Sequence, residues 1–135
     1  MNTMTTYSGR KFDPMQMTPG DVYIEDIAHA LSLLCRGGGQ LSYFYSVGQH
    51  SLNCAAEAKA RGWSERQQLA CLLHDASECY MSDVPTPFKK ELPEYQEQEE
   101  HLLRMILKIC WEKCNMEKSR ICRLIWIIQS GLLLK

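Results

Sequence analysis

Apolar residues recur at three- and four-residue steps over most of the chain from Ile24 onward, and this period constrains the fold most strongly. In the first such stretch, Ile27, Leu31 and Leu34 lie on one face of a helix. The triglycine at residues 37–39 ends this helix, because glycine adopts positive φ at little cost. No stretch shows the sustained alternation of a half-buried strand. The pattern therefore predicts an all-α fold.

Three further helices follow from the same pattern. One runs from about Val47 to Arg61. The next begins after Ser64, which forms a capping-box pattern with Gln67, and runs to about Tyr80. A long amphipathic helix covers about residues 94–110.

The sequence of 135 residues is long enough for one domain with its own hydrophobic core. We predict a single domain over residues 1–135, with an irregular or partly extended lead at residues 1–23. The segment 111–135 differs from the rest, since it contains no Asp and no Pro and is rich in apolar residues. It is too short for a confident membrane span, and we predict an atypical C-terminal helix that packs on the surface or contacts a partner.

Charge and cysteine content narrow the expected partners and compartment. The net charge is −1 and no cluster of Lys and Arg resembles a nucleic-acid footprint, so neither duplex nucleic acid nor a membrane is an expected partner. The seven cysteines are odd in number and no secretory leader precedes them, which favours a reducing, cytoplasmic environment. Cys54, four residues after His50, is interpreted as a small hydrophobe on a helical face.

The stretch LLHDASECYMSDVPTP, residues 72–87, gathers four polar side chains suited to metal or acid–base chemistry: His74, Asp75, Glu78 and Asp83. Imidazole and carboxylate form the ligand set of a borderline divalent cation such as Zn²⁺, Mn²⁺ or Co²⁺. On one continuous helix Glu78 would share a face with His74 and Asp75, because it follows them by four and three residues. His50, on the preceding helix, is a further candidate ligand.

Each of these residues also has a purely structural interpretation. A His-Asp dipeptide such as residues 74–75 is common and by itself usually has no functional meaning. Glu78 alone fits a solvated helix charge, Asp83 alone fits an Asx turn before proline, and His50 alone fits a partly buried histidine with hydrogen-bond partners. A purely structural helical bundle, however, leaves the joint spacing of these groups unexplained. The joint pattern therefore favours a metal site.

The chain resembles the HD-domain metal-dependent phosphohydrolases, and within them the bacterial and phage branch of 5′-deoxynucleotidase-like proteins. The resemblance runs from about residue 7 to about residue 104. It is carried by YSGRKF, DIAHALSLLCRGGG and FYSVGQHS, and above all by HDASECYMSDVPTPFKK. It implies an HD-domain helical bundle and assigns the metal ligands to His50, His74 and Asp75.

The resemblance also implies roles for three further residues. Glu78 and Asp83 would activate or position the attacking water, and Arg36 is the counterpart of an arginine that contacts the substrate phosphate. From the residues alone, a guanidinium beside a triglycine either grips phosphate bidentately or is an ordinary helix C-terminal charge.

The implied activity is hydrolysis of a phosphomonoester with a divalent cation, which could be Mn, Co, Zn, Fe, Ni or Mg. The substrate class is a nucleoside 5′-monophosphate or another small phosphomonoester. Tyr43, Phe44 and Tyr45 would either stack on a base or pack as core and rim. The sequence is also compatible with a homodimer.

One ligand of the family has no counterpart, because no aspartate follows Asp83 where the family places a further aspartate on a later helix. We therefore expect the cation to be held more weakly and the activity to be impaired. The alternative prediction is a catalytically decayed HD-fold protein that binds a nucleotide or a protein partner. The atypical tail favours a frameshifted or decayed gene of prophage type.

Overall fold

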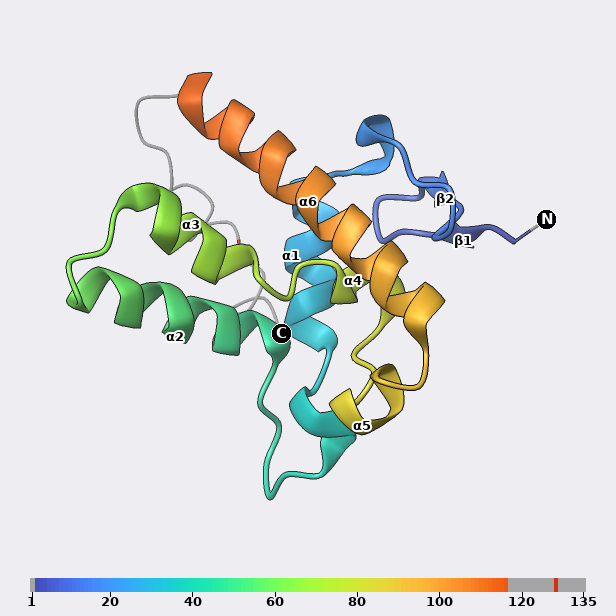
Figure 1. Cartoon of the computed structure of the whole chain (residues 1–135), viewed down its shortest axis with the longest axis horizontal. Coiled ribbons are helices and arrows are strands. Elements are labelled where there is room, and N and C mark those ends of the chain that lie inside the picture. The colour runs from blue at the N-terminus through green and yellow to red at the C-terminus, as the bar shows by residue number, and fades with distance from the viewer. Residues whose placement is uncertain (1, 117–127, 129–135) are drawn as a thin grey trace.

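The computed structural model describes residues 2–116 and residue 128. It is mostly helical, which confirms the all-α fold class (Figure 1). The helical elements, in chain order, are η1 (Pro19–Asp21), α1 (Ile24–Leu33), η2 (Arg36–Gly39), α2 (Val47–Ala60), α3 (Glu65–Leu73), α4 (Glu78–Met81), α5 (Thr86–Lys89) and α6 (Pro93–Met116).

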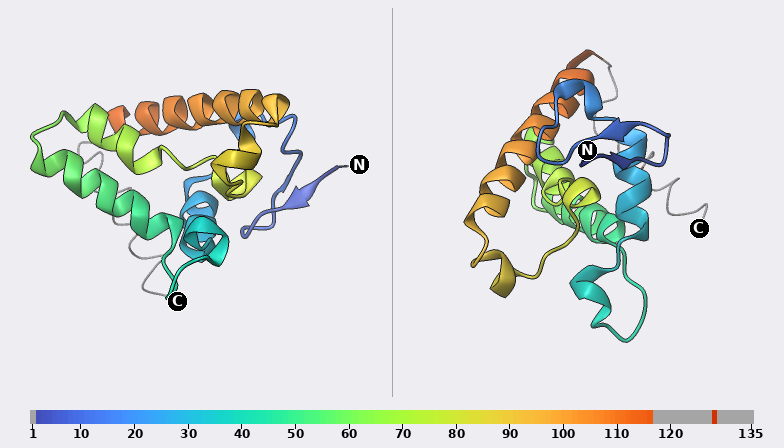
Figure 2. Two further views of the ribbon diagram at one scale, coloured as in Figure 1. Left: turned by 60° about the horizontal axis from the view of Figure 1, so that its bottom comes forward. Right: turned by 90° about the vertical axis from the view of Figure 1, so that its right-hand side faces the viewer.

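The N-terminal lead is more ordered than predicted. The short strands β1 (Met4–Thr5) and β2 (Lys11–Phe12) pair antiparallel as a small hairpin beside α1 (Figure 2). Ser8, in the turn of the hairpin, donates from its main-chain N and from Oγ to the carboxylate of Asp26, each at 2.8 Å. Because Asp26 is buried on α1, these bonds fasten the lead to the helical core.

The core lies where α1 packs against α2 and α4, and where α3 packs between α2 and α6 (Figures 1 and 2). α2 and α3 run antiparallel, side by side. A Cβ added at Gly48 would lie 3.3 Å from the main-chain carbonyl of Leu31, so glycine allows the first turn of α2 to approach α1 closely. The fully buried side chains of this core include Ile27, Leu31, Val47, Leu72, Leu73, Leu102, Ile106 and Ile128.

The Ser64–Gln67 capping box is confirmed, but the single helix predicted from Ser64 to Tyr80 is wrong. α3 ends at Leu73, and residues 74–77 form successive turns before α4. The main-chain N–H groups of Ala76, Glu78 and other residues here bond three residues back, as in a 3₁₀-helix. Glu78 therefore does not follow His74 along one α-helical face, and its position depends on these turns.

The C-terminal tail lies almost entirely outside the described residues. α6 extends beyond the predicted end near Cys110 and includes residues 111–116 of the segment predicted as atypical. Ile128 is fully buried in the core, and residues 117–127 and 129–135 of the predicted C-terminal helix fall outside the described residues. No helix in the described part of the chain is long and apolar enough to cross a membrane.

Candidate metal centre

The connection between α1 and α2 holds Arg36 beside the first turn of α2. Two main-chain hydrogen bonds join the two ends of this connection. They run from Arg36 N to Tyr45 O and from Val47 N to Leu34 O, each at 2.8 Å. Ser46, which is buried, caps α2 with its hydroxyl oxygen. The start of α2 and the arginine are thus fixed to the same short piece of main chain.

The triglycine has a different role from the predicted one. α1 already ends at Leu33, and the glycines form most of η2, with φ values of 62°, 62° and 83° at residues 37, 38 and 39. Three successive positive φ values are strained for any residue except glycine. The triglycine therefore lets the chain turn back immediately after Arg36.

Three predicted ligand atoms converge where α2 meets the end of α3. His50 Nε2 lies 3.2 Å from His74 Nε2. Asp75 Oδ2 lies 3.0 Å from His74 Nε2 and 3.5 Å from His50 Nε2. All three side chains are partly accessible to solvent.

These separations fit one bound cation. Around a divalent cation with bonds of about 2.1 Å, two ligand atoms that subtend about 90° to 110° lie roughly 3.0 to 3.4 Å apart. The three separations between His50, His74 and Asp75 fall in or next to this range. Two imidazoles and a carboxylate are also a donor set that borderline divalent cations accept.

A main-chain carbonyl orients His74. Its Nδ1 lies 2.7 Å from Cys71 O, and because a carbonyl only accepts hydrogen bonds, Nδ1 carries the proton. In the neutral ring Nε2 then has the free lone pair, and it lies next to His50 and Asp75; in the protonated ring Nε2 instead donates to Asp75 Oδ2. Support of this kind for the second ring nitrogen is typical of metal-binding histidines.

The charges at the centre favour a neutral His50 and an ionised Asp75. Burial, followed by the nearby Arg36 and His74, lowers the pKa of His50. Burial alone would raise the pKa of Asp75, but the hydrogen bond from His74 and the surrounding positive charge hold it below its usual value. The hydrogen bond to Asp75 raises the pKa of His74, so cation binding at His74 competes with a proton.

Arg36 contacts the same carboxylate oxygen as the two histidines. Its Nη1 lies 3.4 Å from Asp75 Oδ2, and its side chain is one-third exposed. A guanidinium has five N–H donors, and the contact with Asp75 uses one of them. Arg36 therefore brings a positive charge to the edge of the centre.

Glu78 is the most deeply buried of the predicted site residues. Its side chain is 5% exposed, and Oε2 has no hydrogen-bond partner among the described residues. Burial, with added repulsion from Asp75 and Asp83, raises the pKa of Glu78 to about 8. A carboxyl group in this state changes its protonation close to neutral pH, as a general acid or base requires.

Asp83 lies beyond a strained turn at the end of α4. Ser82 has a φ of 69°, which is uncommon for a residue other than glycine. Tyr95 on α6 holds this turn, since its hydroxyl lies 3.0 Å from Met81 O and 3.1 Å from Ser82 O. The turn brings the half-buried Asp83 close enough that its charge acts on the pKa of both His50 and Glu78.

Cys54 was not predicted as a site residue, but it belongs to the same cluster. Its Sγ lies 3.6 Å from His50 Nε2, and ligand atoms of His50, Cys54 and His74 all lie within 4.8 Å of one another. This cluster could hold a metal ion. The available sequence signal was the i, i+4 spacing from His50, which places both side chains on one helical face.

Comparison with known proteins gives relatives without an assigned activity. The chain is 38% identical over 102 residues to the uncharacterized protein YfdR of Escherichia coli (strain K12). This alignment covers 76% of the present chain and 54% of YfdR. It is 48% identical over 87 residues to the uncharacterized protein RCAP_rcc00048 of Rhodobacter capsulatus, with 61% of this chain and 44% of that protein covered. The chain thus spans about half the length of these relatives. No family model matches it.

Proposed function

We propose that this protein is a divalent-metal-dependent phosphohydrolase with an HD-domain fold that acts on a nucleoside 5′-monophosphate. The observation that carries the proposal is the convergence of His50 Nε2, His74 Nε2 and Asp75 Oδ2 at separations of 3.0 to 3.5 Å. A purely structural cluster would not need two imidazole nitrogens and a carboxylate oxygen so close together at an opening to solvent.

His50, His74 and Asp75 would hold the cation. When bound, a divalent cation polarises a phosphoryl oxygen and lowers the pKa of a water molecule. Glu78, ionised for part of the time near neutral pH, would accept a proton from the attacking water. Asp83 would help to position that water from the loop after α4.

Arg36 supports a phosphorylated substrate. Its guanidinium lies beside Asp75 on a side chain that is one-third exposed, and it would bind the non-bridging phosphoryl oxygens. Tyr43 and Phe44, 72% and 61% exposed on the loop that starts at Arg36, offer aromatic faces to a nucleobase. Charge and aromatic surface on one loop favour a nucleotide over an isolated phosphate.

The direct experiment is phosphate release from a panel of ribonucleoside and deoxyribonucleoside 5′-monophosphates with added Mn²⁺ or Co²⁺. We expect release that stops when a chelator is added and that is absent in His74→Ala. His101→Ala, an exposed histidine of α6, serves as the matched control and should keep the wild-type rate. Equal phosphate release by wild type and His74→Ala would contradict the proposal.

A second candidate function is favoured by a specific observation, that residues 84–135 contain no aspartate to add to the ligands His50, His74 and Asp75. Under this alternative the same centre and loop bind a nucleotide without hydrolysing it. A nucleotide would then raise the unfolding temperature, because it binds only the native state, and no phosphate would be released. Metal-dependent turnover in the panel would exclude this alternative.

A further inference from the structure

Cys54 lies on the same half-buried face of α2 as His50 and at a ligand-like distance from it. The separation between Cys54 Sγ and His50 Nε2 is 3.6 Å, and the sulfur and a nitrogen of His74 belong to a group of atoms no more than 4.8 Å apart. Cys54 is half-buried, so the thiol is neither enclosed in the core nor fully solvated.

We propose that Cys54 Sγ is a fourth protein ligand of the candidate metal centre and binds the cation as a thiolate. This inference rests on the metal-binding part of the proposed function, but it does not require catalysis. It would complete a set of two nitrogens, one oxygen and one sulfur from α2 and from the turn after α3. No aspartate after Asp83 is then needed to fill the set.

The measured separation matches the expected geometry. With a metal–nitrogen bond of about 2.1 Å and a metal–sulfur bond of about 2.3 Å, a tetrahedral site places the two ligand atoms roughly 3.6 Å apart. His50 Nε2 and Cys54 Sγ are 3.6 Å apart, and His50 Nε2 and His74 Nε2 are 3.2 Å apart. These two separations are therefore close to those of ligand atoms around one cation, and Cys54 Sγ lies within 4.8 Å of a His74 nitrogen.

A thiolate ligand has a consequence for metal selectivity. Thiolates favour Zn²⁺, Co²⁺ and Fe²⁺, whereas Mg²⁺ and Mn²⁺ favour oxygen ligands. Formation of the metal–sulfur bond releases the thiol proton to solvent, so the sulfur binds as an anion and no oxidant or reductant is involved. The centre should therefore prefer Zn²⁺, Co²⁺ and Fe²⁺ to Mg²⁺ and Mn²⁺.

Cys71 offers a matched control on the facing helix. Cys54 and Cys71 line the same pocket between α2 and α3, together with Trp63 and other residues, and both are half-buried. Cys71 supports His74 only through its main-chain carbonyl, which a side-chain substitution leaves in place. Cys54→Ser and Cys71→Ser thus remove equivalent thiols, only one of which is placed to bind the cation.

The test is a Co²⁺ titration of the full chain followed by absorbance. Visible d–d bands report Co²⁺ bound by protein ligands, and a near-ultraviolet charge-transfer band reports a sulfur–cobalt bond. We expect both in the wild type and in Cys71→Ser. Cys54→Ser should lose the charge-transfer band and keep the d–d bands. Removal of a residue that only supports a ligand weakens metal binding about 10- to 100-fold, so loss of the ligand itself should weaken Co²⁺ binding by at least as much.

The possible failures are distinguishable. Wild-type d–d bands without a charge-transfer band, or loss of that band in Cys71→Ser alone, would overturn the assignment to Cys54 and leave the histidine centre intact. Absence of all cobalt bands in a wild type that circular dichroism shows to be helical would overturn both the metal centre and this inference. Cobalt bands that depend on Cys54, without phosphate release, would support the inference and refute only the hydrolase.

Discussion

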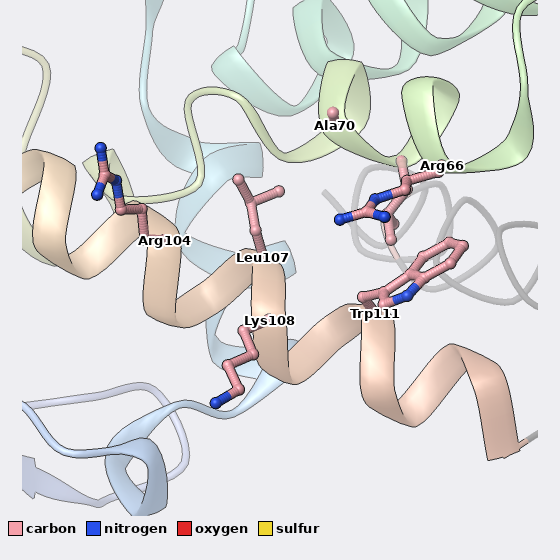
Figure 3. Close-up of a pocket in the computed structure, with 7 residues that line it drawn as sticks. Arg66, Ala70, Arg104, Leu107, Lys108 and Trp111 are labelled. Carbon is pink, nitrogen blue, oxygen red and sulfur yellow. The ribbon is translucent and has the colours of Figure 1, made fainter.

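The candidate metal centre and a second region of the molecule both contain charged side chains, but the two differ in how these side chains are arranged. The second region, which we call the basic groove, lies between α3 and α6 and encloses about 330 Å³ (Figure 3). Its lining residues are Arg66, Leu69, Ala70, Arg104, Leu107, Lys108 and Trp111.

In the basic groove the cationic groups have separate neighbours. The guanidinium of Arg66 lies 5.5 Å from the centroid of the Trp111 ring, and Figure 3 shows these two side chains facing one another. Arg104 pairs with Glu100 on its own helix, with both side chains largely exposed. Lys108 points away from them. No shared point of binding results from these contacts.

At the metal centre, by contrast, nitrogen and oxygen atoms from different elements meet within 3.0 to 3.5 Å of each other. Holding polar atoms together in a partly desolvated place has a free-energy cost that a bound cation can offset. Exposed cations that are paired locally have almost no such cost. Convergence, rather than the number of charges, distinguishes the candidate site from the groove.

The largest expected effect follows from removal of a converging atom. His74→Ala should abolish binding of Co²⁺ or Zn²⁺ at micromolar concentration, with an affinity loss beyond the roughly 10- to 100-fold typical of outer residues. Metal content of the purified protein, by elemental analysis, and calorimetric titration would measure this loss. If His74→Ala kept the wild-type metal content, the converging atoms would not be what binds the cation, and the contrast with the basic groove would have no basis.

A smaller but still large effect is expected from Arg36→Ala. Loss of one preorganised donor at a developing negative charge lowers turnover by about 10²- to 10³-fold, and we expect this drop in kcat/KM for the best nucleotide of the panel. Metal content should remain. Arg66→Ala in the basic groove removes the same kind of side chain and should leave kcat/KM at the wild-type value. Equal losses in both variants would show that the groove takes part in the site.

A third prediction concerns the buried carboxyl group of Glu78 in the metal-free protein. Its pKa is about 8 in the folded chain against 4.5 as the ordinary value, so between these values the unfolded chain loses a proton that the folded chain keeps. The free energy of unfolding should therefore fall as the pH rises through this range, by at most about 1.4 kcal/mol per pH unit from this group. Below the ordinary pKa this stability is fully present.

Urea unfolding at several pH values, with a chelator present, measures this dependence. Glu78→Gln cannot titrate and should show a shallower fall with pH than the wild type. Glu97→Gln, on the exposed surface of α6, makes the same chemical change without burial and should follow the wild type. Parallel curves for the wild type and Glu78→Gln would contradict a raised pKa at this position.

The helices were predictable because their signals are local. The apolar period and the Ser64–Gln67 capping box lie within a few residues of the elements they define, so α1, α2 and the start of α3 agree with the sequence to within a few residues. The hairpin in the lead was missed because each of its strands is only two residues long, which is too short to show alternation.

The break after α3 could not be predicted because it depends on a contact that the helical period does not encode. The carbonyl of Cys71 would accept from Asp75 N in a continuing α-helix, but it accepts from the ring of His74. The role of Cys54 was missed for a related reason, since whether a cysteine packs as a hydrophobe or faces a histidine depends on its neighbours in space. The family resemblance led us to expect one shared site for His50, His74, Asp75 and Arg36. Their chemical roles stay predictions.

The smallest effect is expected from the basic groove itself. Arg104 and Lys108 are both exposed, and the pair between Arg104 and Glu100 joins side chains one turn apart on the same helix. Exposed pairs of this kind contribute little, so Arg104→Ala with Lys108→Ala should change the free energy of unfolding by no more than about 0.5 kcal/mol. Metal affinity and kcat/KM should equal those of the wild type in the same assays used for His74→Ala and Arg36→Ala. A loss of activity in this double variant, with metal content intact, would mean that the charges of the basic groove bind the substrate without converging atoms. The distinction between the basic groove and the metal centre would then fail.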